Sequence, residues 1–205
     1  MSLQKRRAKE ILTMLEKRYP NATIALDYSN NFELLVSVML SAQTTDAQVN
    51  KVTPSLFKKY KGKNEKEEIS NFANVNIKKL EKDISSIGLF RAKSKNIKLT
   101  SQIILKKFHG RIPKTMAELL ELPGVGRKTA NIVLYHAFGK IAGIAVDTHV
   151  RRLSKELGFT KHTDPEKIEK DLMKLFEKED WPQVTHLLIA FGRDKRNKDR
   201  HLLFD

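Results

Sequence analysis

Residues 119–131 read LLELPGVGRKTAN, and this stretch decides the fold prediction. A short apolar run ends at Pro123, a Pro-Gly-Val-Gly turn follows, and a helical pattern begins at Arg127. Gly124 and Gly126 permit backbone angles closed to other residues and leave no side chain above the peptide. The N–H groups of the turn and of the new helix can therefore approach a phosphate closely. An ordinary turn between two helices explains the same four residues equally well.

The overall charge favours the phosphate interpretation. The 205 residues include 39 Lys and Arg against 24 Asp and Glu, a net charge of +15, which favours a polyanionic partner. A membrane surface is the weaker candidate because no apolar stretch approaches the roughly 20 residues of a membrane span. The first residues are too densely charged for a signal peptide, so we expect a cytoplasmic protein.

The chain has no cysteine. This excludes disulfides, thiolate catalysis, zinc–thiolate fingers and cysteine-ligated iron–sulfur clusters within these residues. We expect no cofactor and no certain metal.

Apolar residues recur at helical spacing along almost the whole sequence. We find no alternating strand pattern with hairpin turns and no fixed repeat, and the only strand candidate is the short run 143–146, which reads equally well as a buried loop. The prediction is an all-α fold. The expected helices span 3–18, 32–41, 46–59, two short stretches between 67 and 85, 91–108, 116–120, 127–138, 148–157, 165–176 and 181–191. The helix 32–41 is apolar nearly all round, so we expect it to be buried at the centre of the fold. In the amphipathic helix 91–108, we expect Ile97, Ile103, Ile104 and Leu105 to face inward.

The stretch LPGVGRKTANIVL resembles the helix–hairpin–helix motif of the endonuclease III family of DNA repair glycosylases. The resemblance extends, in the family's order, to LLVSVMLSAQTTDAQVNK, IGLFRAKSKNI and IAVDTHVRRL, and so covers about residues 34–192. It implies two helical domains with the active site in the cleft between them. One is a six-helix domain over 24–140 that holds the hairpin, and the other joins 1–23 to 141–205.

Lys128 is the first candidate catalytic residue. It lies in the first turn of a helix, whose positive end disfavours the ammonium form and makes a neutral, nucleophilic amine more accessible. A surface lysine that binds phosphate explains its position as well. Lys128 matches the catalytic lysine of the family motif, and the resemblance then implies a Schiff base with an opened sugar.

Asp147 is the second candidate. An acid that follows three apolar residues and precedes a helix is often only an N-cap. The resemblance implies that it is the catalytic carboxylate, which would stabilise positive charge at the sugar C1′ and help to deprotonate the lysine or a water. Both roles are compatible.

Gln43 and Leu89 match the residues that the family inserts into the DNA stack. A flipped base leaves a hole that a protein fills with a polar or an apolar side chain. Leu89 follows Gly88, so we expect it at a loop tip. A helix-cap glutamine and a core leucine are the alternatives. Asp46 matches a family acid near the base pocket, and a capping role explains it equally well.

The hairpin itself supplies further expected DNA contacts, and His149 is a candidate because it lies two residues after Asp147. The carbonyls of Leu120, Leu122 and Val125 match positions that hold a monovalent cation in some relatives. The expected DNA-binding residues of the hairpin are Gly124, Val125, Gly126, Arg127 and Thr129.

The C-terminal stretch departs from the family pattern. Many members carry a four-cysteine loop with an iron–sulfur cluster there, whereas residues 193–200 of this chain hold five basic and two acidic residues. We hypothesise that Arg193 and Arg196 supply phosphate contacts instead. A flexible charged tail is the equal alternative.

The resemblance implies a monomeric, bifunctional DNA glycosylase and AP lyase of base excision repair, acting on double-stranded DNA that contains damaged bases or abasic sites. Oxidised pyrimidines are the expected lesions. One alternative keeps the fold but removes mismatched uracil or thymine, or oxidised guanine. Another is a non-catalytic helix–hairpin–helix module that only binds DNA, which would have no need of the Lys128 and Asp147 pair. No membrane partner is expected, and the location would be cytoplasmic and nucleoid-associated.

Overall fold

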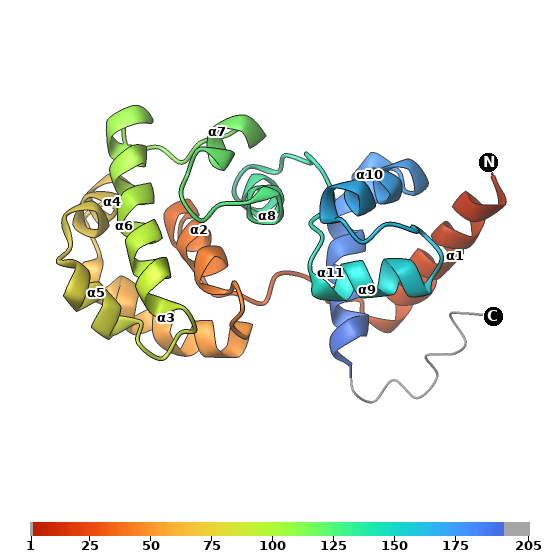
Figure 1. Cartoon of the computed structure of the whole chain (residues 1–205), viewed down its shortest axis with the longest axis horizontal. Helices are drawn as coiled ribbons and strands as arrows, with labels where there is room; N and C mark the ends of the chain where they lie inside the picture. Colours follow the sequence, from red (N-terminus) through yellow and green to blue (C-terminus); the bar gives the residue numbers. More distant parts are fainter. Residues whose placement is uncertain (1, 195–205) are drawn as a thin grey trace. The chain divides into compact units, whose positions relative to one another are not determined.

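The computed structural model describes residues 2–194 of the chain (Figure 1). Within them it holds α-helices, one short 3₁₀ helix and no strand, so the all-α prediction is confirmed. The helices are α1 (Leu3–Arg18), α2 (Asn31–Leu40), α3 (Asp46–Tyr60), α4 (Glu65–Asn74), α5 (Ile77–Asp83), α6 (Phe90–Lys107), α7 (Met116–Leu120), α8 (Arg127–Phe138), α9 (Thr148–Glu156), α10 (Pro165–Leu175), η1 (Lys178–Asp180) and α11 (Trp181–Arg193).

Most of these helices begin at a side chain that accepts a hydrogen bond from the first turn. Such a cap stabilises a helix by about 1 kcal/mol. The helices α6, α8 and α11 and the short η1 lack a side-chain cap. The capping residues are Ser2, Asn30, Thr45, Asn64, Asn76, Thr115, Asp147 and Asp164.

The chain divides into two compact units, of which one is Ala25–Lys140. Its centre is α2, in which every residue from Phe32 to Leu40 is buried. This helix is apolar nearly all round because α3, α4, α6 and α8 pack against its different sides. The predicted buried central helix is therefore confirmed.

The second unit joins the residues up to Ile24 with those from Ile141 onward. The apolar face of α1, with Ile11 and Leu15, packs against α10 and α11, and α9 packs on α11 as well. This core buries leucines, isoleucines and phenylalanines that are far apart in the sequence. Spacing alone does not predict that the first helix packs here.

The structure decides between the two interpretations of one short run and corrects a prediction for α6. The run 143–146 is a loop, tied to α11 by the hydroxyl of Thr185, which accepts from the N–H of Ala145 and donates to its carbonyl. On α6, Ile97 and Ile104 are buried as predicted, but Ile103 and Leu105 are only partly buried. Their places on the inner face are taken by polar residues, Ser94, Thr100 and Ser101 among them.

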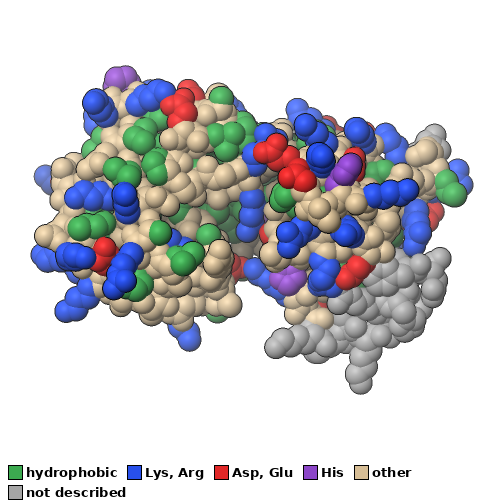
Figure 2. Space-filling model, in the orientation of Figure 1, with side chains coloured by type: hydrophobic (Ala, Val, Ile, Leu, Met, Phe, Trp, Pro, Cys, Tyr) green, Lys and Arg blue, Asp and Glu red, His purple; other side chains and the backbone are tan. Residues whose placement is uncertain are grey.

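Lysine and arginine side chains are scattered over the face drawn in Figure 2, among apolar and acidic ones. The net charge of +15 is therefore not gathered in one patch of that face. In residues 2–194, no helix combines the length and the apolar character that crossing a membrane requires. The distribution of charge therefore does not identify a binding surface on this face.

Candidate functional site

Side chains of α6 contact the hairpin turn between α7 and α8. Gly124 has φ +81°, the left-handed region, and a Cβ on it would lie 2.8 Å from the Asn96 side-chain nitrogen. The Thr100 hydroxyl donates to the carbonyl of Pro123 at 3.1 Å. Val125 closes the turn by donating its N–H to the carbonyl of Leu122. The glycine at 124 is thus required both by its backbone angle and by the close approach of α6.

Gly126 plays a different part from the one its sequence predicted. Its φ of −98° is open to any residue, so the expectation of an unusual backbone angle is wrong at this position. What a side chain would change is the space: a Cβ on Gly126 would meet no heavy atom within 4 Å. No side chain caps α8, whose first amides have no intrahelical acceptor. An open, uncapped helix start of this kind suits an anion.

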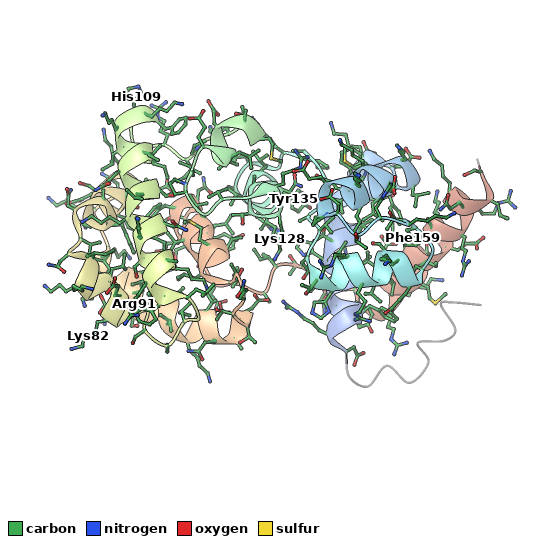
Figure 3. All side chains as sticks on the ribbon, in the orientation of Figure 1. Lys82, Arg91, His109, Lys128, Tyr135 and Phe159 are labelled. Carbon is green, nitrogen blue, oxygen red and sulfur yellow. The ribbon has the colours of Figure 1, made fainter. Side chains whose placement is uncertain are left out.

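Arg127, Lys128 and Thr129 form the first turn of α8, and all three are partly buried. Figure 3 marks Lys128 on α8. The hairpin therefore presents an amine within one helical turn of the candidate anion site. Both features come from consecutive residues, so they cannot separate without unfolding the start of α8.

The Val125 side chain is buried, so only its backbone groups can contact a ligand at the surface. The carbonyl of Leu122 accepts from the Val125 N–H, and a carbonyl oxygen retains a second lone pair. The monovalent cation at Leu120, Leu122 and Val125 stays a prediction. Among the described residues, no group of three or more His, Asp or Glu side chains is arranged to hold a metal ion.

Gln43 and Leu89 share an unusual backbone: both have positive φ, 53° and 59°, without being glycine. Their two loops lie side by side, because Gln48 at the start of α3 donates to the Ser86 hydroxyl at 3.0 Å. A Cβ on Gly88 would also lie 3.3 Å from the Gln43 carbonyl oxygen. Leu89 is 57% exposed, which excludes the core-leucine alternative.

Thr45 and Asp46, which lie next to these loops at the start of α3, have structural roles. Thr45, rather than Gln43 or Asp46, is the side-chain cap of α3. Asp46 occupies the first turn of that helix, where a negative charge complements the helix dipole.

Asp147 and His149 lie at the start of α9, in the second unit. One carboxylate oxygen of Asp147 accepts from the Val150 N–H at 2.8 Å, so the predicted N-cap exists. His149 is partly buried and lies over Gly192 of α11, where a Cβ would come 2.6 Å from its ring Nδ1. Gly192 thus provides the space for this imidazole.

The predicted residues fall into two groups. The hairpin, Lys128, Gln43 and Leu89 belong to the unit 25–140, and the structure brings the last two together. Asp147, His149 and Arg193 belong to the other unit, with Arg193 in the last turn of α11. Arg196 lies outside the described residues.

Three residues of α6 were missed by the sequence reasoning: Lys93, Asn96 and Thr100. Asn96 and Thr100 support the hairpin, and Lys93 contacts the Gln43 loop. A signal was present for Lys93, which recurs with Ile97, Thr100 and Ile104 at helical spacing. A lysine on the apolar stripe of a helix is a candidate buried cation.

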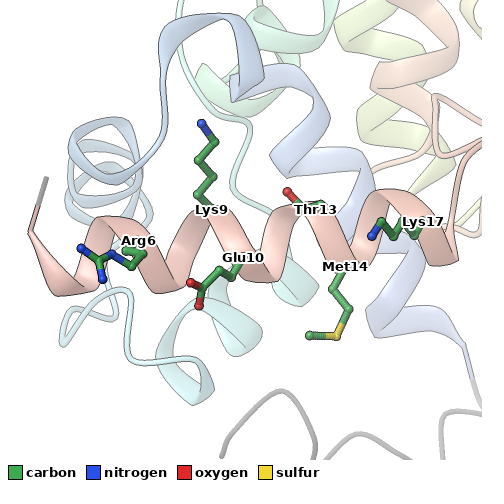
Figure 4. Close-up of a pocket in the computed structure, with 6 residues that line it drawn as sticks. All are labelled: Arg6, Lys9, Glu10, Thr13, Met14 and Lys17. Atoms are coloured by element: carbon green, nitrogen blue, oxygen red, sulfur yellow. The ribbon is translucent and has the colours of Figure 1, made fainter.

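A surface groove of about 470 Å³ runs along α1 (Figure 4). Its lining comes from that one helix and mixes basic side chains with Thr13 and Met14. None of the candidate site residues lines it, so the groove is separate from the predicted chemistry.

Known proteins share this hairpin and these helices. Residues 36–178 match the model of the HhH-GPD superfamily base excision DNA repair proteins. The chain therefore belongs to the HhH-GPD superfamily of base excision DNA repair proteins.

The comparison narrows further within that class. The chain is 51% identical to endonuclease III of Synechocystis sp. over 94% of its own length and 85% of that protein, and 49% identical to endonuclease III of Bacillus subtilis over 85% and 77%. A trapped covalent intermediate of endonuclease III with DNA superposes with a TM-score of 0.86 at 46% identity, covering 94% of this chain and 87% of that one. The chain belongs to the endonuclease III family.

A thermostable thymine-DNA glycosylase also shares the fold, with a TM-score of 0.79 at 21% identity over 97% of this chain and 92% of that one. At that identity the likeness speaks for the fold alone. Lesion preference therefore has to be argued from other grounds.

Proposed function

We propose that this protein is a bifunctional DNA glycosylase and AP lyase of base excision repair, with Lys128 as its nucleophile. The observation that carries the proposal is the position of Lys128 in the first turn of α8, two residues after Gly126, where the helix has no side-chain cap. The membership of the endonuclease III family supports it, since a solved relative is a covalent intermediate with DNA. Double-stranded DNA that contains damaged bases or abasic sites is the partner.

The proposed reaction needs one amine and one carboxylate. The damaged nucleotide leaves the stack, and the neutral Lys128 amine attacks C1′ as the glycosidic C–N bond breaks. The base departs with the bonding electron pair and takes up a proton, and the nitrogen loses one. The C1′–O4′ bond then breaks, O4′ takes up a proton as the ring opens, and the nitrogen and C1′ form a protonated imine. The imine acidifies C2′–H. A base takes that proton, the C3′–O3′ bond breaks, and the strand on the 3′ side leaves with a phosphate at its 5′ end. Water then hydrolyses the imine.

Asp147 is the proposed carboxylate. Its charge stabilises the positive character that develops at C1′, and it accepts a proton from the attacking amine or from water. Capping α9 does not conflict with this role, because one oxygen holds the Val150 N–H and a carboxylate has several acceptor positions. The cap fixes the side chain, which favours a defined catalytic geometry.

Gln43 and Leu89 are the proposed fillers of the DNA stack. A polar and an apolar side chain side by side can occupy the hole and contact the base left without a partner. The amides in the first turn of α8, from Arg127 to Thr129, bind a backbone phosphate next to Gly124 and Gly126, and His149 and Arg193 are further DNA contacts in this proposal.

Oxidised pyrimidines are the proposed lesions, and the second candidate is a uracil, thymine or oxidised-guanine specificity on the same fold. A set of duplexes, each with one lesion, separates these possibilities by single-turnover excision rates. The monomeric state and the cytoplasmic, nucleoid-associated location stay predictions.

An iron–sulfur cluster does not fit these residues. The 205 residues include no cysteine and so offer no thiolate ligand. No step of the mechanism runs through such a group. The hypothesis that a basic segment takes over its DNA contacts concerns Arg193, at the end of α11, and residues beyond the described part of the chain.

Borohydride trapping on a duplex with a single abasic site tests the proposal. Reduction of the imine should link the protein to DNA, and Lys128→Ala should lose the adduct and the strand cleavage. Lys106→Ala, an exposed lysine at the far end of α6, is the matched control and should trap normally. If the unmutated protein gives no adduct, the lyase proposal is wrong and a purely DNA-binding module is favoured.

A further inference from the structure

Lys93 is a buried lysine, with only 6% of its surface exposed. Its ammonium donates to the carbonyl of Leu40 at 2.9 Å, to the carbonyl of Ala42 at 2.6 Å and to the Thr44 hydroxyl at 3.0 Å. An ammonium has three donors, so all of them are in use. Because the residue is buried and its three donors contact protein oxygens, the surroundings rather than water satisfy this group. Burial also lowers the pKa of Lys93.

These three acceptors lie at one place in the fold. Leu40 is the last residue of α2, where carbonyls lack helical partners and the helix dipole is negative. Ala42 and Thr44 flank Gln43 on either side. The ammonium of Lys93 therefore closes the end of α2 and fastens both neighbours of Gln43 to α6.

The same residue is tied to the second loop through its backbone. The N–H of Lys93 donates to the carbonyl of Leu89 at 3.0 Å, the first hydrogen bond of α6. Lys93 thus connects the two non-glycine residues that adopt a left-handed backbone side by side. Such backbones cost free energy and persist only where the surrounding structure determines them.

We propose that Lys93 is a positioning residue that presents Gln43 and Leu89 together, ready to enter the DNA stack. The inference rests on the proposed filling role of those two side chains. Lys93 does not touch the DNA in this proposal. It fixes the loop geometry before the duplex arrives, so that the cost of ordering the loop is not met at the moment of base flipping.

Another lysine of the same helix provides a matched control. Lys98 is partly buried, and its ammonium donates to one backbone carbonyl, that of Val75 after α4, at 2.8 Å. It has the same chemistry at the same helix and no contact with either loop. Lys98→Met therefore removes a comparable hydrogen bond without touching the Gln43 loop.

The main test compares Lys93→Met with Lys98→Met under single-turnover conditions, on a duplex with one thymine glycol. Methionine fills a similar volume and leaves the three acceptors without their donor. We expect excision by Lys93→Met to fall about 10- to 100-fold, the effect of a small misplacement of reacting parts, while Lys98→Met stays within about twofold. The affinity of both variants for undamaged duplex should be unchanged, because the hairpin is intact.

Two further measurements separate positioning from a loss of folding. A 2-aminopurine opposite the lesion reports the base left without a partner, and its fluorescence rise on binding should be smaller for Lys93→Met. Thr44→Val removes one acceptor and keeps the lysine, so it should show a weaker form of the same defect even if Lys93→Met does not fold.

A double-mutant comparison then decides whether Lys93 acts through the fillers. In a Gln43→Ala and Leu89→Ala background, Lys93→Met should add less than about a twofold further loss. A full additional loss would overturn the inference, as would an Lys93→Met enzyme with normal excision and fluorescence. If the alanine fillers alone leave excision unchanged, the filling role fails and the inference with it, whereas the borohydride adduct of Lys128 would still stand.

Discussion

The first turns of α2 and α8 belong to the same unit and are built in opposite ways. At α2, the Asn30 side chain accepts from the N–H of Glu33, the Glu33 carboxylate accepts from the N–H of Ser29, and Glu65 of α4 reaches across to another amide of the turn. At α8, Gly126 brings no side chain at all.

This difference separates a structural helix start from one kept for a ligand. Every side-chain acceptor at α2 satisfies an amide within the protein, and the carboxylates of Glu33 and Glu65 also complement the helix dipole with negative charge. The start of α8 forgoes about 1 kcal/mol of capping and holds two cations, Arg127 and Lys128, where acids would stabilise the helix. Such a start is favourable once a phosphate arrives.

The start of α9 combines both designs, and the largest predicted effect lies there. Asp147 caps the helix, and its charge is proposed to act on the sugar. Asp147→Asn keeps a capping oxygen but removes the charge, so excision should fall about 10²- to 10⁴-fold with little change in the free energy of unfolding. Single-turnover kinetics and urea unfolding measure the two quantities.

Asp147→Ala is the control for the cap, because it should lose the same activity and, in addition, about 1 kcal/mol of stability. If Asp147→Asn retains full activity, the carboxylate is only a cap, and α9 begins like α2.

The second prediction concerns the glutamates that contact the start of α2. It is that the free energy of unfolding depends on pH. Glu68 of α4 is buried and has one oxygen without a hydrogen-bond partner, while Asn30 donates to the other at 2.8 Å. Burial raises the pKa of Glu68 to about 7, and the charges of Glu33 and Glu65 add to the rise. The folded state therefore holds this proton more tightly than the unfolded chain, in which the pKa is near its ordinary value of about 4.5.

A raised pKa in the folded state gives stability that is fully present below pH 4.5 and is lost as pH rises towards 7. A shift of this size corresponds to about 3 kcal/mol at most. Urea unfolding of the unmutated protein and of Glu68→Gln between pH 4.5 and 7.5 tests this, since glutamine cannot ionise and should flatten that part of the profile. Parallel profiles would contradict the prediction.

The two hairpin glycines carry the third prediction, which sharpens the comparison at α8. Gly124→Ala meets both a positive φ and the Asn96 side chain, so it should reduce the free energy of unfolding by about 1–3 kcal/mol. Gly126→Ala enters open space and should change stability by less than about 0.5 kcal/mol. Its methyl group nevertheless occupies the space proposed for a phosphate, so affinity for abasic duplex should fall about tenfold, or about 1.4 kcal/mol.

Denaturant unfolding and a DNA-binding titration of both variants give the answer. If both variants lose the same free energy of unfolding, the space around Gly126 is as crowded as the space around Gly124. If Gly126→Ala binds DNA with unchanged affinity, the prediction that this turn binds a phosphate is wrong.

The sequence predicted the helices well because their signals are local. Apolar spacing, a proline or glycine at a boundary and a capping residue lie within a few positions of one another, and α7 and α8 begin and end where these signals indicate. The hairpin and Lys128 form a single continuous stretch, so their proximity could also be predicted. The prediction for Gly126 was wrong because its backbone angle depends on the surrounding structure and not on the fact that the residue is a glycine.

The parts that could not be predicted depend on contacts between distant segments. The loop of Gln43 is held by Lys93, whose ammonium binds the Ala42 carbonyl 51 positions away, and no local rule assigns φ +53° to a glutamine. The hydrogen bond from the Phe32 N–H at the start of α2 to Glu65 spans 33 positions. Tertiary packing determines both, so a reading of one sequence finds the residues but not their conformations.

The smallest predicted effect distinguishes a phosphate bound by amides from one bound by a cation. Arg193 lies in the last turn of α11, where a positive charge already stabilises the helix by about 0.3–1 kcal/mol, so stability alone cannot reveal a DNA contact. Each phosphate that a cation neutralises contributes about 0.9 to the slope of log affinity against log salt. Arg193→Ala should therefore reduce that slope by about 0.9, and Arg193→Lys should keep it. Gly126→Ala should weaken binding without changing the slope, because backbone amides carry no net charge. An unchanged slope in Arg193→Ala would leave α11 with a helix-stabilising arginine, and the binding of phosphate would then depend on the hairpin and on residues outside the described part of the chain.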